Sequence, residues 1–174
     1  METRRIARHL LMTNRTVNRT FPRRVLSTIE DAIKASESAH SGQVRFAVEG
    51  ALEGEPLFSG QSARERAIDV FSRLRVWDTE HNNGLLIYLL LADRAVEIVA
   101  DRGIDQKVGS HEWDSVCKEM EAAFRLSDFE GGVLGGVGAV TQHLAKHFPS
   151  GGRRKNELPD KPVVLRSKQR WGQS

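Results

Sequence analysis

The chain is nearly devoid of cysteine, the residue that small proteins use for covalent stabilisation. Its 174 residues include one cysteine, Cys117, which excludes an internal disulfide framework. Cys117 stands among the helix-like residues Trp113, Val116 and Met120, so we interpret it as a small buried hydrophobic residue. The sequence also lacks the Walker A, C-x-x-C, G-x-S-x-G and H-E-x-x-H motifs. It therefore indicates no complete catalytic centre, and we assign no catalytic residue.

Long hydrophobic runs are missing as well. The longest, residues 85–92, is far shorter than the roughly 20 residues that a membrane-spanning helix needs. Residues 10–12 are the longest apolar run near the N-terminus, too short for the core of a secretory signal. We therefore expect no membrane span and a cytoplasmic protein. The three tryptophans do not alternate with basic residues, so no RNA-stacking surface is indicated.

The net charge of +3 conceals an uneven distribution along the chain. Residues 1–24 carry seven arginines and one acid, and residues 149–174 carry seven basic residues and two acids. Residues 25–148 are left with an excess of negative charge. An acidic body favours cations over nucleic acid, so we expect nucleic-acid contact only through the basic ends. We interpret residues 1–21 as a basic N-terminal segment and residues 150–174 as a basic disordered tail.

Hydrophobic periodicity predicts four helices and three strands in the order α-β-α-β-β-α-α. The predicted helices cover residues 20–39, 62–75, 111–124 and 129–147, and the predicted strands cover residues 43–51, 85–91 and 95–100. The first two strands enclose a helix, so they should be parallel with a right-handed crossover. The last two should form an antiparallel hairpin that turns at residues 93–94. This order predicts an α/β fold: a three-layer α-β-α sandwich with a small mixed central sheet.

The first half of the last predicted helix is rich in glycine, which weakens a helix by about 1 kcal/mol per residue relative to alanine. Its glycines are Gly131, Gly132, Gly135, Gly136 and Gly138. Spacings of four residues leave bare backbone on two neighbouring ridges of the helix. We therefore expect close approach to a neighbouring element, in preference to a phosphate-binding loop.

Polar side chains precede the first strand of the predicted hairpin and follow the second. Asp78, Glu80 and Asn83 lie on one side, and Asp101 and Asp105 on the other. In a hairpin these two segments share one edge of the sheet. Carboxylate, amide and carbonyl oxygens on loops are the ligands that Ca²⁺ prefers. The alternative is that these residues only cap turns and helices; no EF-hand spacing is present.

Three segments, read together, resemble one known family. They are N-N-G-L-L-I-Y-L-L-L-A-D-R-A-V-E-I-V-A-D-R-G-I-D at 82–105, F-R-L-S-D-F-E-G-G-V at 124–133 and K-H-F-P at 146–149. They resemble the TPM domain family, the group that includes thylakoid-lumen phosphatase-like and photosystem-repair proteins. The similarity spans residues 22–149, and the later N-E-L-P-D at 156–160 resembles the tail of a short bacterial cytosolic subgroup.

The resemblance implies a mixed sheet between helices and a divalent-cation site at one sheet edge. Calcium is the expected ion, with Mg²⁺ or another divalent cation as alternatives. The matched positions include Asn83, Asp101 and Asp128. The chain departs from the glycine-rich form of many members at residues 101–103, which leaves the ligand set open.

Three functions follow from these features. The first is a cation-binding interaction or regulatory module with a protein partner. The second is a metal-dependent phosphatase-like hydrolase of phosphomonoesters, in which Asp78, Asp101 and Asp128 would hold the metal. The third is a nucleic-acid or membrane adaptor that works through the basic ends.

Overall fold

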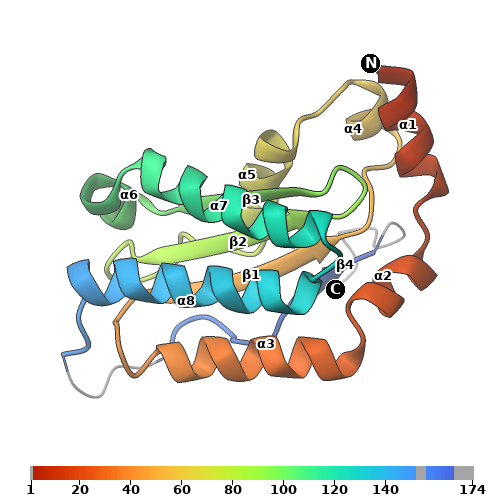
Figure 1. Cartoon of the computed structure of the whole chain (residues 1–174). Helices are drawn as coiled ribbons and strands as arrows, with labels where there is room; N and C mark the ends of the chain where they lie inside the picture. The colour runs from red at the N-terminus through yellow and green to blue at the C-terminus, as the bar shows by residue number, and fades with distance from the viewer. Residues whose placement is uncertain (1, 152–155, 167–174) are drawn as a thin grey trace, which may run out of the picture.

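A computed structural model describes residues 2–151 and 156–166 and shows a four-stranded sheet with helices on both faces (Figure 1). The strands are β1 (Gln43–Glu49), β2 (Gly84–Leu90), β3 (Ala95–Ala100) and β4 (Val163–Leu165). Their order across the sheet is β3-β2-β1-β4. The predicted mixed sheet is confirmed, and it contains one strand more than predicted.

The strand pairing follows the predicted connections. β1 and β2 run parallel, from Gln43 beside Gly84 to Glu49 beside Leu90, and the chain between them forms α5 (Ala63–Arg73). β2 and β3 pair antiparallel. Arg94 has a φ of 52° in the turn between them, a left-handed conformation that allows the tight reversal. The parallel crossover and the hairpin are both confirmed.

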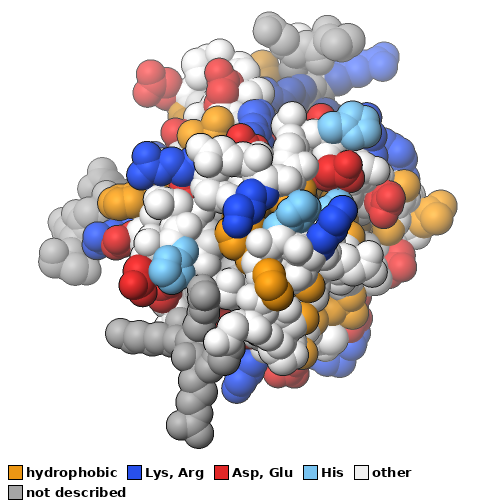
Figure 2. Space-filling view, turned by 90° about the vertical axis from the view of Figure 1, so that its left-hand side faces the viewer, with side chains coloured by type: hydrophobic (Ala, Val, Ile, Leu, Met, Phe, Trp, Pro, Cys, Tyr) orange, Lys and Arg blue, Asp and Glu red, His pale blue; other side chains and the backbone are white. Residues whose placement is uncertain are grey.

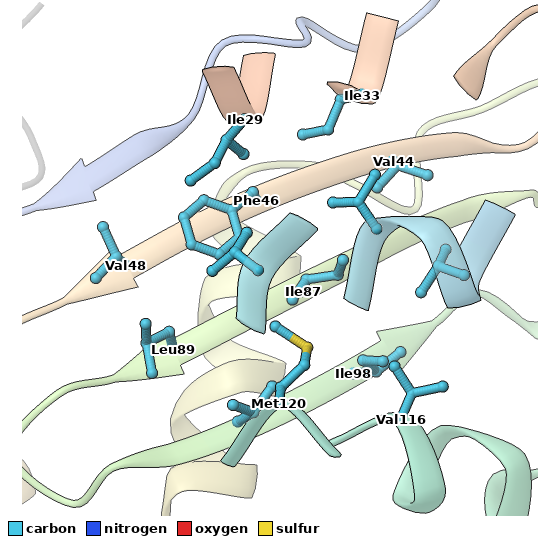
Figure 3. Packing of buried hydrophobic residues seen from close by; sticks show 14 of the residues in the cluster. Ile29, Ile33, Val44, Phe46, Val48, Ile87, Leu89, Ile98, Val116 and Met120 are labelled. Atoms are coloured by element: carbon cyan, nitrogen blue, oxygen red, sulfur yellow. The ribbon is translucent and has the colours of Figure 1, made fainter. Parts of the chain in front are cut away.

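One face of the sheet is covered by α3 (Arg23–Ser36), α7 (Ser110–Arg125) and α8 (Phe129–His147). Alternate strand residues point into this layer, among them Phe46, Ile87 and Ile98, which pack against helix residues such as Ile29 and Met120 (Figure 3). The period of two along each strand places these residues on the same face.

The other face packs against α5 and forms a second hydrophobic core. Ala47 of β1 and Leu86 of β2 are fully buried there, together with Ala67 and Val70 of α5. Both faces of β1 and β2 are therefore covered, which explains the continuous apolar run in β2. The three-layer α-β-α sandwich is confirmed.

The C-terminal region corrects the predicted disordered tail. Residues 156–166 are ordered against the body, and β4 pairs parallel with β1 from Val163 beside Ala47 to Leu165 beside Glu49. The buried side chain of Leu165 joins the second core. The edge of β1 offers unpaired backbone groups, and β4 satisfies them. Residues 152–155 and 167–174, which the same prediction covered, lie outside the described residues.

Two side chains of β1 hold this segment in place. The guanidinium of Arg45 donates hydrogen bonds to the carbonyl oxygens of Pro159 and Lys161. The side-chain oxygen of Gln43 accepts hydrogen bonds from the backbone N–H groups of Glu157 and Leu158. A segment with few apolar residues is thus fixed by polar contacts that only the folded sheet provides.

The basic N-terminal segment is also structured, as α1 (Glu2–Leu11) and α2 (Asn14–Thr20). His9 of α1 is 2% exposed; its Nε2 lies 3.0 Å from Asp93 Oδ1, and its Nδ1 accepts the backbone N–H of Leu52. The guanidinium of Arg5 adds a 2.9 Å contact to Asp93. Asp93, at the turn of the predicted hairpin, therefore anchors a helix that is distant in sequence.

Two short helices complete the described chain. They are α4 (Glu55–Phe58), which precedes α5, and α6 (Arg102–Val108), which follows β3. Within the described ranges, the helices are too short or too polar for any of them to cross a bilayer.

The glycine-rich helix approaches its neighbour as predicted, but along one ridge only. A Cβ atom at Gly132 would lie 2.6 Å from Phe124 of α7, and one at Gly136 would meet the side chain of Met120. A Cβ atom at Gly135 would meet open space. The ridge of Gly132 and Gly136 is therefore the one that brings α8 against α7.

Candidate functional site

The two polar loops meet at the edge of the sheet where β2 begins and β3 ends. The backbone N–H of Asp101 donates to the carbonyl of Gly84 at 2.8 Å, and that of Gly103 donates to the carbonyl of Asn82 at 3.1 Å. This edge is at the α6 end of the molecule in Figure 1, which faces the viewer in Figure 2. The predicted convergence of these loops is confirmed.

Asn83 is the most buried of the candidate residues, at 1% exposure. Its side-chain Nδ2 donates to the carbonyl oxygen of Ser41 at 2.7 Å. Because a carbonyl oxygen only accepts, this contact sets the orientation of the amide and turns Oδ1 the other way. That buried Oδ1 has no hydrogen-bond partner among the described residues.

Asp101 stands at the N-cap of α6, where Oδ1 accepts the backbone N–H of Arg102 at 2.7 Å. Its second oxygen, Oδ2, is buried and likewise finds no partner within the part of the chain that the structure describes. A buried polar atom without a partner costs about 1–3 kcal/mol. This edge therefore has two buried oxygens without partners in residues 2–151 and 156–166, Asn83 Oδ1 and Asp101 Oδ2, on adjoining loops. A role in turns or helix caps alone does not explain them.

Close approach of the loops depends on Gly103. A Cβ atom at this position would lie 2.5 Å from the carbonyl oxygen of Asn82 and 2.9 Å from that of His81. Asn82 itself has a φ of 51°. The backbone here turns two carbonyl oxygens towards the Asp101 loop, and any larger residue at 103 would force the loops apart.

The other predicted ligands at this edge make different contacts. Asp78 is half-exposed and forms a 2.8 Å ion pair with Arg75. Glu80 is exposed, and Asp105 lies on the outer side of α6. No three His, Cys, Asp or Glu side chains in the described ranges lie close enough together to hold a metal ion. A cation at this edge would therefore rely on amide, carbonyl and water oxygens beside the carboxylate of Asp101.

Asp128 lies away from this edge. It caps α8, with Oδ1 accepting the backbone N–H of Gly131 at 2.9 Å. The opposite end of α8 reaches the start of α7, where the rings of His143 and Trp113 are 5.4 Å apart. The 19 residues of α8 span about 28 Å. The predicted grouping of Asp128 with Asp78 and Asp101 is therefore wrong.

Sequence reasoning missed Glu157 as part of this edge. Its carboxylate accepts the backbone N–H of Glu80 at 2.9 Å, so the C-terminal segment supports the loop that carries Asn83. Thr79 supports the same loop through its hydroxyl oxygen, which accepts the N–H of Asn83. The N-E-L-P-D motif was a signal for Glu157, but it falls in the segment that was predicted to be disordered.

The charge around the site is mixed. Figure 2 shows acidic, basic and histidine side chains interspersed on this end of the molecule. The guanidinium of Arg102 lies beside the loop, with Nε 3.3 Å from Asn82 Oδ1. The excess of acidic residues in the body therefore does not gather into one acidic patch on this face.

Cys117 does not supply a nucleophile. Burial, followed by the charge of Glu97, raises the pKa of its thiol to about 12. The thiol stays protonated at neutral pH, which agrees with the interpretation of Cys117 as a small hydrophobic residue.

Comparison with known proteins places the chain in a family. Residues 19–143 match the TPM domain. The BA42 protein of the psychrophilic bacterium Bizionia argentinensis, solved by NMR, is 30% identical with a TM-score of 0.70; the match covers 82% of this chain and 93% of that one.

A more distant structure shares the fold alone. The N-terminal domain of a P. gingivalis protein is 20% identical with a TM-score of 0.55, over 70% of this chain and 76% of that one. No curated protein gives a significant match. The match over residues 19–143 and the similarity to BA42 show that this chain belongs to the TPM domain family.

Proposed function

We propose that this TPM domain binds a divalent cation, Ca²⁺ in the first place, at the sheet edge formed by the loops of Asn83 and Asp101, and that it acts as an interaction or regulatory module. The observation that supports the proposal is the pair of buried oxygens, Asn83 Oδ1 and Asp101 Oδ2, without hydrogen-bond partners in the described chain. Cation binding between these loops would supply the partner that such buried oxygens lack within the described residues.

The donor set suits calcium better than zinc or copper. It combines an amide oxygen, a carboxylate oxygen and the nearby backbone carbonyls, all of them hard ligands, and Ca²⁺ tolerates irregular geometry on loops. A site with one firmly placed carboxylate has low charge, so we expect a weak affinity, of the order of 10⁻⁴ to 10⁻³ M. Mg²⁺, which demands stricter geometry and loses water reluctantly, should bind less well.

Hydrolysis of phosphomonoesters has less support. The three aspartates that this role needs are not together, because Asp128 caps α8 at its far end. We therefore propose binding as the function of the site, and assign no turnover to it.

The chain offers a matched pair of variants for a test. Asp101 and Asp128 both cap a helix through Oδ1, and asparagine keeps that capping role. In a calcium titration of metal-free protein, followed by calorimetry and amide chemical shifts, Asp101→Asn should weaken binding strongly. Asp128→Asn should leave it unchanged. The shifts of the unaltered protein should centre on residues 79–84 and 101–105.

Equal calcium binding by the unaltered protein, Asp101→Asn and Asp128→Asn would show that the buried carboxylate oxygen of Asp101 is not a ligand. Absence of any shift change at millimolar calcium in the unaltered protein would refute the proposal outright.

A further inference from the structure

The N-terminal region differs from the rest of the chain in its charge. From Thr3 to Ile29 the sequence contains seven arginines and no acidic residue. This stretch contains most of α1 and all of α2, which lie one after the other along the side of the molecule opposite α6 (Figure 1). The candidate cation site and this basic region are therefore at opposite ends.

α1 has two distinct sides. Ile6 and His9 face inward, and His9 is held by Asp93 and by the backbone of Leu52. At 100° per residue, Arg4 and Leu11 fall on the opposite side, and both are exposed. The contacts of His9 fix the rotation of the helix, so this outer side is presented to solvent in a defined orientation.

The outer side combines arginines with large apolar residues. Leu10 is 66% exposed and Leu11 is 79% exposed. Arg4 is exposed on the side of Leu11, and Arg8 is exposed at the flank of the helix, where its guanidinium also lies 3.3 Å from Asp93. Two adjacent leucines this exposed lose the benefit of burial in the free protein. Arg15 of α2 is also exposed. We define the basic apolar face as Arg4, Arg8, Leu10, Leu11, Arg15 and Arg19.

We propose that the basic apolar face docks the protein onto an anionic membrane surface. Interfacial helices bind in this way: apolar side chains enter the boundary between headgroups and acyl chains while arginines contact lipid phosphates. The helices lie on the surface and do not cross the bilayer. This function goes beyond cation binding and uses none of the residues of the candidate cation site.

A nucleic acid would also attract the arginines of this face, as an anionic lipid surface does. It would make no favourable contact with the exposed leucines. Phosphate contacts to a duplex need basic and polar side chains, and single strands stack on aromatic rings. The basic apolar face has no aromatic residue, and two of its six members are leucines. The combination favours a lipid surface as the partner.

The test is co-sedimentation of the full chain with vesicles of phosphatidylcholine and phosphatidylglycerol, and with vesicles of phosphatidylcholine alone. We expect binding to the anionic vesicles that weakens as salt rises, and little binding to the neutral ones. The variant Leu10→Ser/Leu11→Ser should lower the partition coefficient by at least about tenfold. Arg4→Glu/Arg15→Glu should abolish binding.

Ile68→Ser is the matched control, because Ile68 is also exposed, at 45%, but lies on α5. It should bind as the unaltered protein does. Circular dichroism confirms that each variant is folded. Unchanged vesicle binding by the leucine variant would overturn the proposal, because pure charge attraction would then suffice. Binding to duplex DNA without binding to anionic vesicles would also overturn the proposal.

Discussion

Arg66 of α5 donates two hydrogen bonds, each 2.8 Å long, to the two carboxylate oxygens of Glu49 at the end of β1. Both side chains are nearly buried in the second core. The hydroxyl of Tyr88 donates to the same carboxylate at 2.7 Å. Burial, with the neighbouring charge of Glu49, raises the pKa of Tyr88 above its usual value, so the phenol remains a donor. This cluster joins α5 to the two central strands.

Replacing Arg66 with methionine should lower the free energy of unfolding by about 3–5 kcal/mol, because it leaves the buried charge of Glu49 without a cation. Urea unfolding measures the change. The double variant Arg66→Met/Glu49→Leu should recover most of the loss. Arg75→Met, which removes an exposed pair with Asp78, should cost less than about 1 kcal/mol. Equal losses in Arg66→Met and Arg75→Met would contradict the role of burial.

Two glycines of α8 should respond in opposite directions to alanine. Gly135→Ala places a methyl group in open space and should raise the free energy of unfolding by about 0.5–1 kcal/mol, since alanine is the better helix former. Gly132→Ala brings a methyl group within 2.6 Å of Phe124 and 3.0 Å of Ala123, so it should destabilise the protein. Thermal unfolding of both variants tests this pair, and a shift of the same sign in both would exclude close helix contact at Gly132.

Removing the guanidinium of Arg45 should release the C-terminal strand. Arg45→Met loses the hydrogen bonds to Pro159 and Lys161, and bonds to charged groups contribute about 1.5–3 kcal/mol. Amide hydrogen exchange at residues 163–165 should speed up, while exchange in β2 stays slow. Arg125→Met, an exposed substitution on α7, is the control and should leave the exchange of β4 unchanged. Unaltered protection of β4 in Arg45→Met would mean that backbone pairing alone holds the strand.

Stability should fall between mildly acidic and neutral pH because of Glu37. Burial, followed by a hydrogen bond with the carboxyl group of Asp160, raises the pKa of Glu37 from 4.5 to about 7. The folded state thus holds this proton more tightly than the unfolded state. The resulting stabilisation is complete below pH 4.5 and is lost as the pH rises through 7.

Glu37→Gln should remove this pH dependence and be the more stable protein at pH 8. Glu37 is only partly buried, so solvent screening limits the difference to about 1 kcal/mol. Urea unfolding of both proteins between pH 5 and pH 8 makes the measurement. A constant difference between them across that range would show that Glu37 titrates normally.

Hydrophobic periodicity in the sequence was sufficient to predict a helix or strand where a single period, 3.6 or 2 residues, dominates the segment. The alternation of β1 and β3, the apolar run of β2 and the stripes of the longer helices predicted three of the four strands and the helices α3, α5, α7 and α8. The hairpin then required the loops of Asn83 and Asp101 to share an edge, because antiparallel strands return the chain to where it began. Asp128 was misplaced because a cap residue at a helix start looks the same in sequence wherever that start lies in space.

The sequence by itself determined the α/β architecture, the parallel crossover, the hairpin and the loops that meet at the sheet edge, since each depends on contacts between near neighbours or on short connections. Only the tertiary structure decided the placement of both ends. β4 is only three residues long, and α1 is amphipathic but mostly polar. Arg45 and Gln43 hold the segment of β4, and Asp93 holds α1; all three residues lie far from these elements in sequence. Such long-range contacts cannot be predicted from the local periodicity of the sequence.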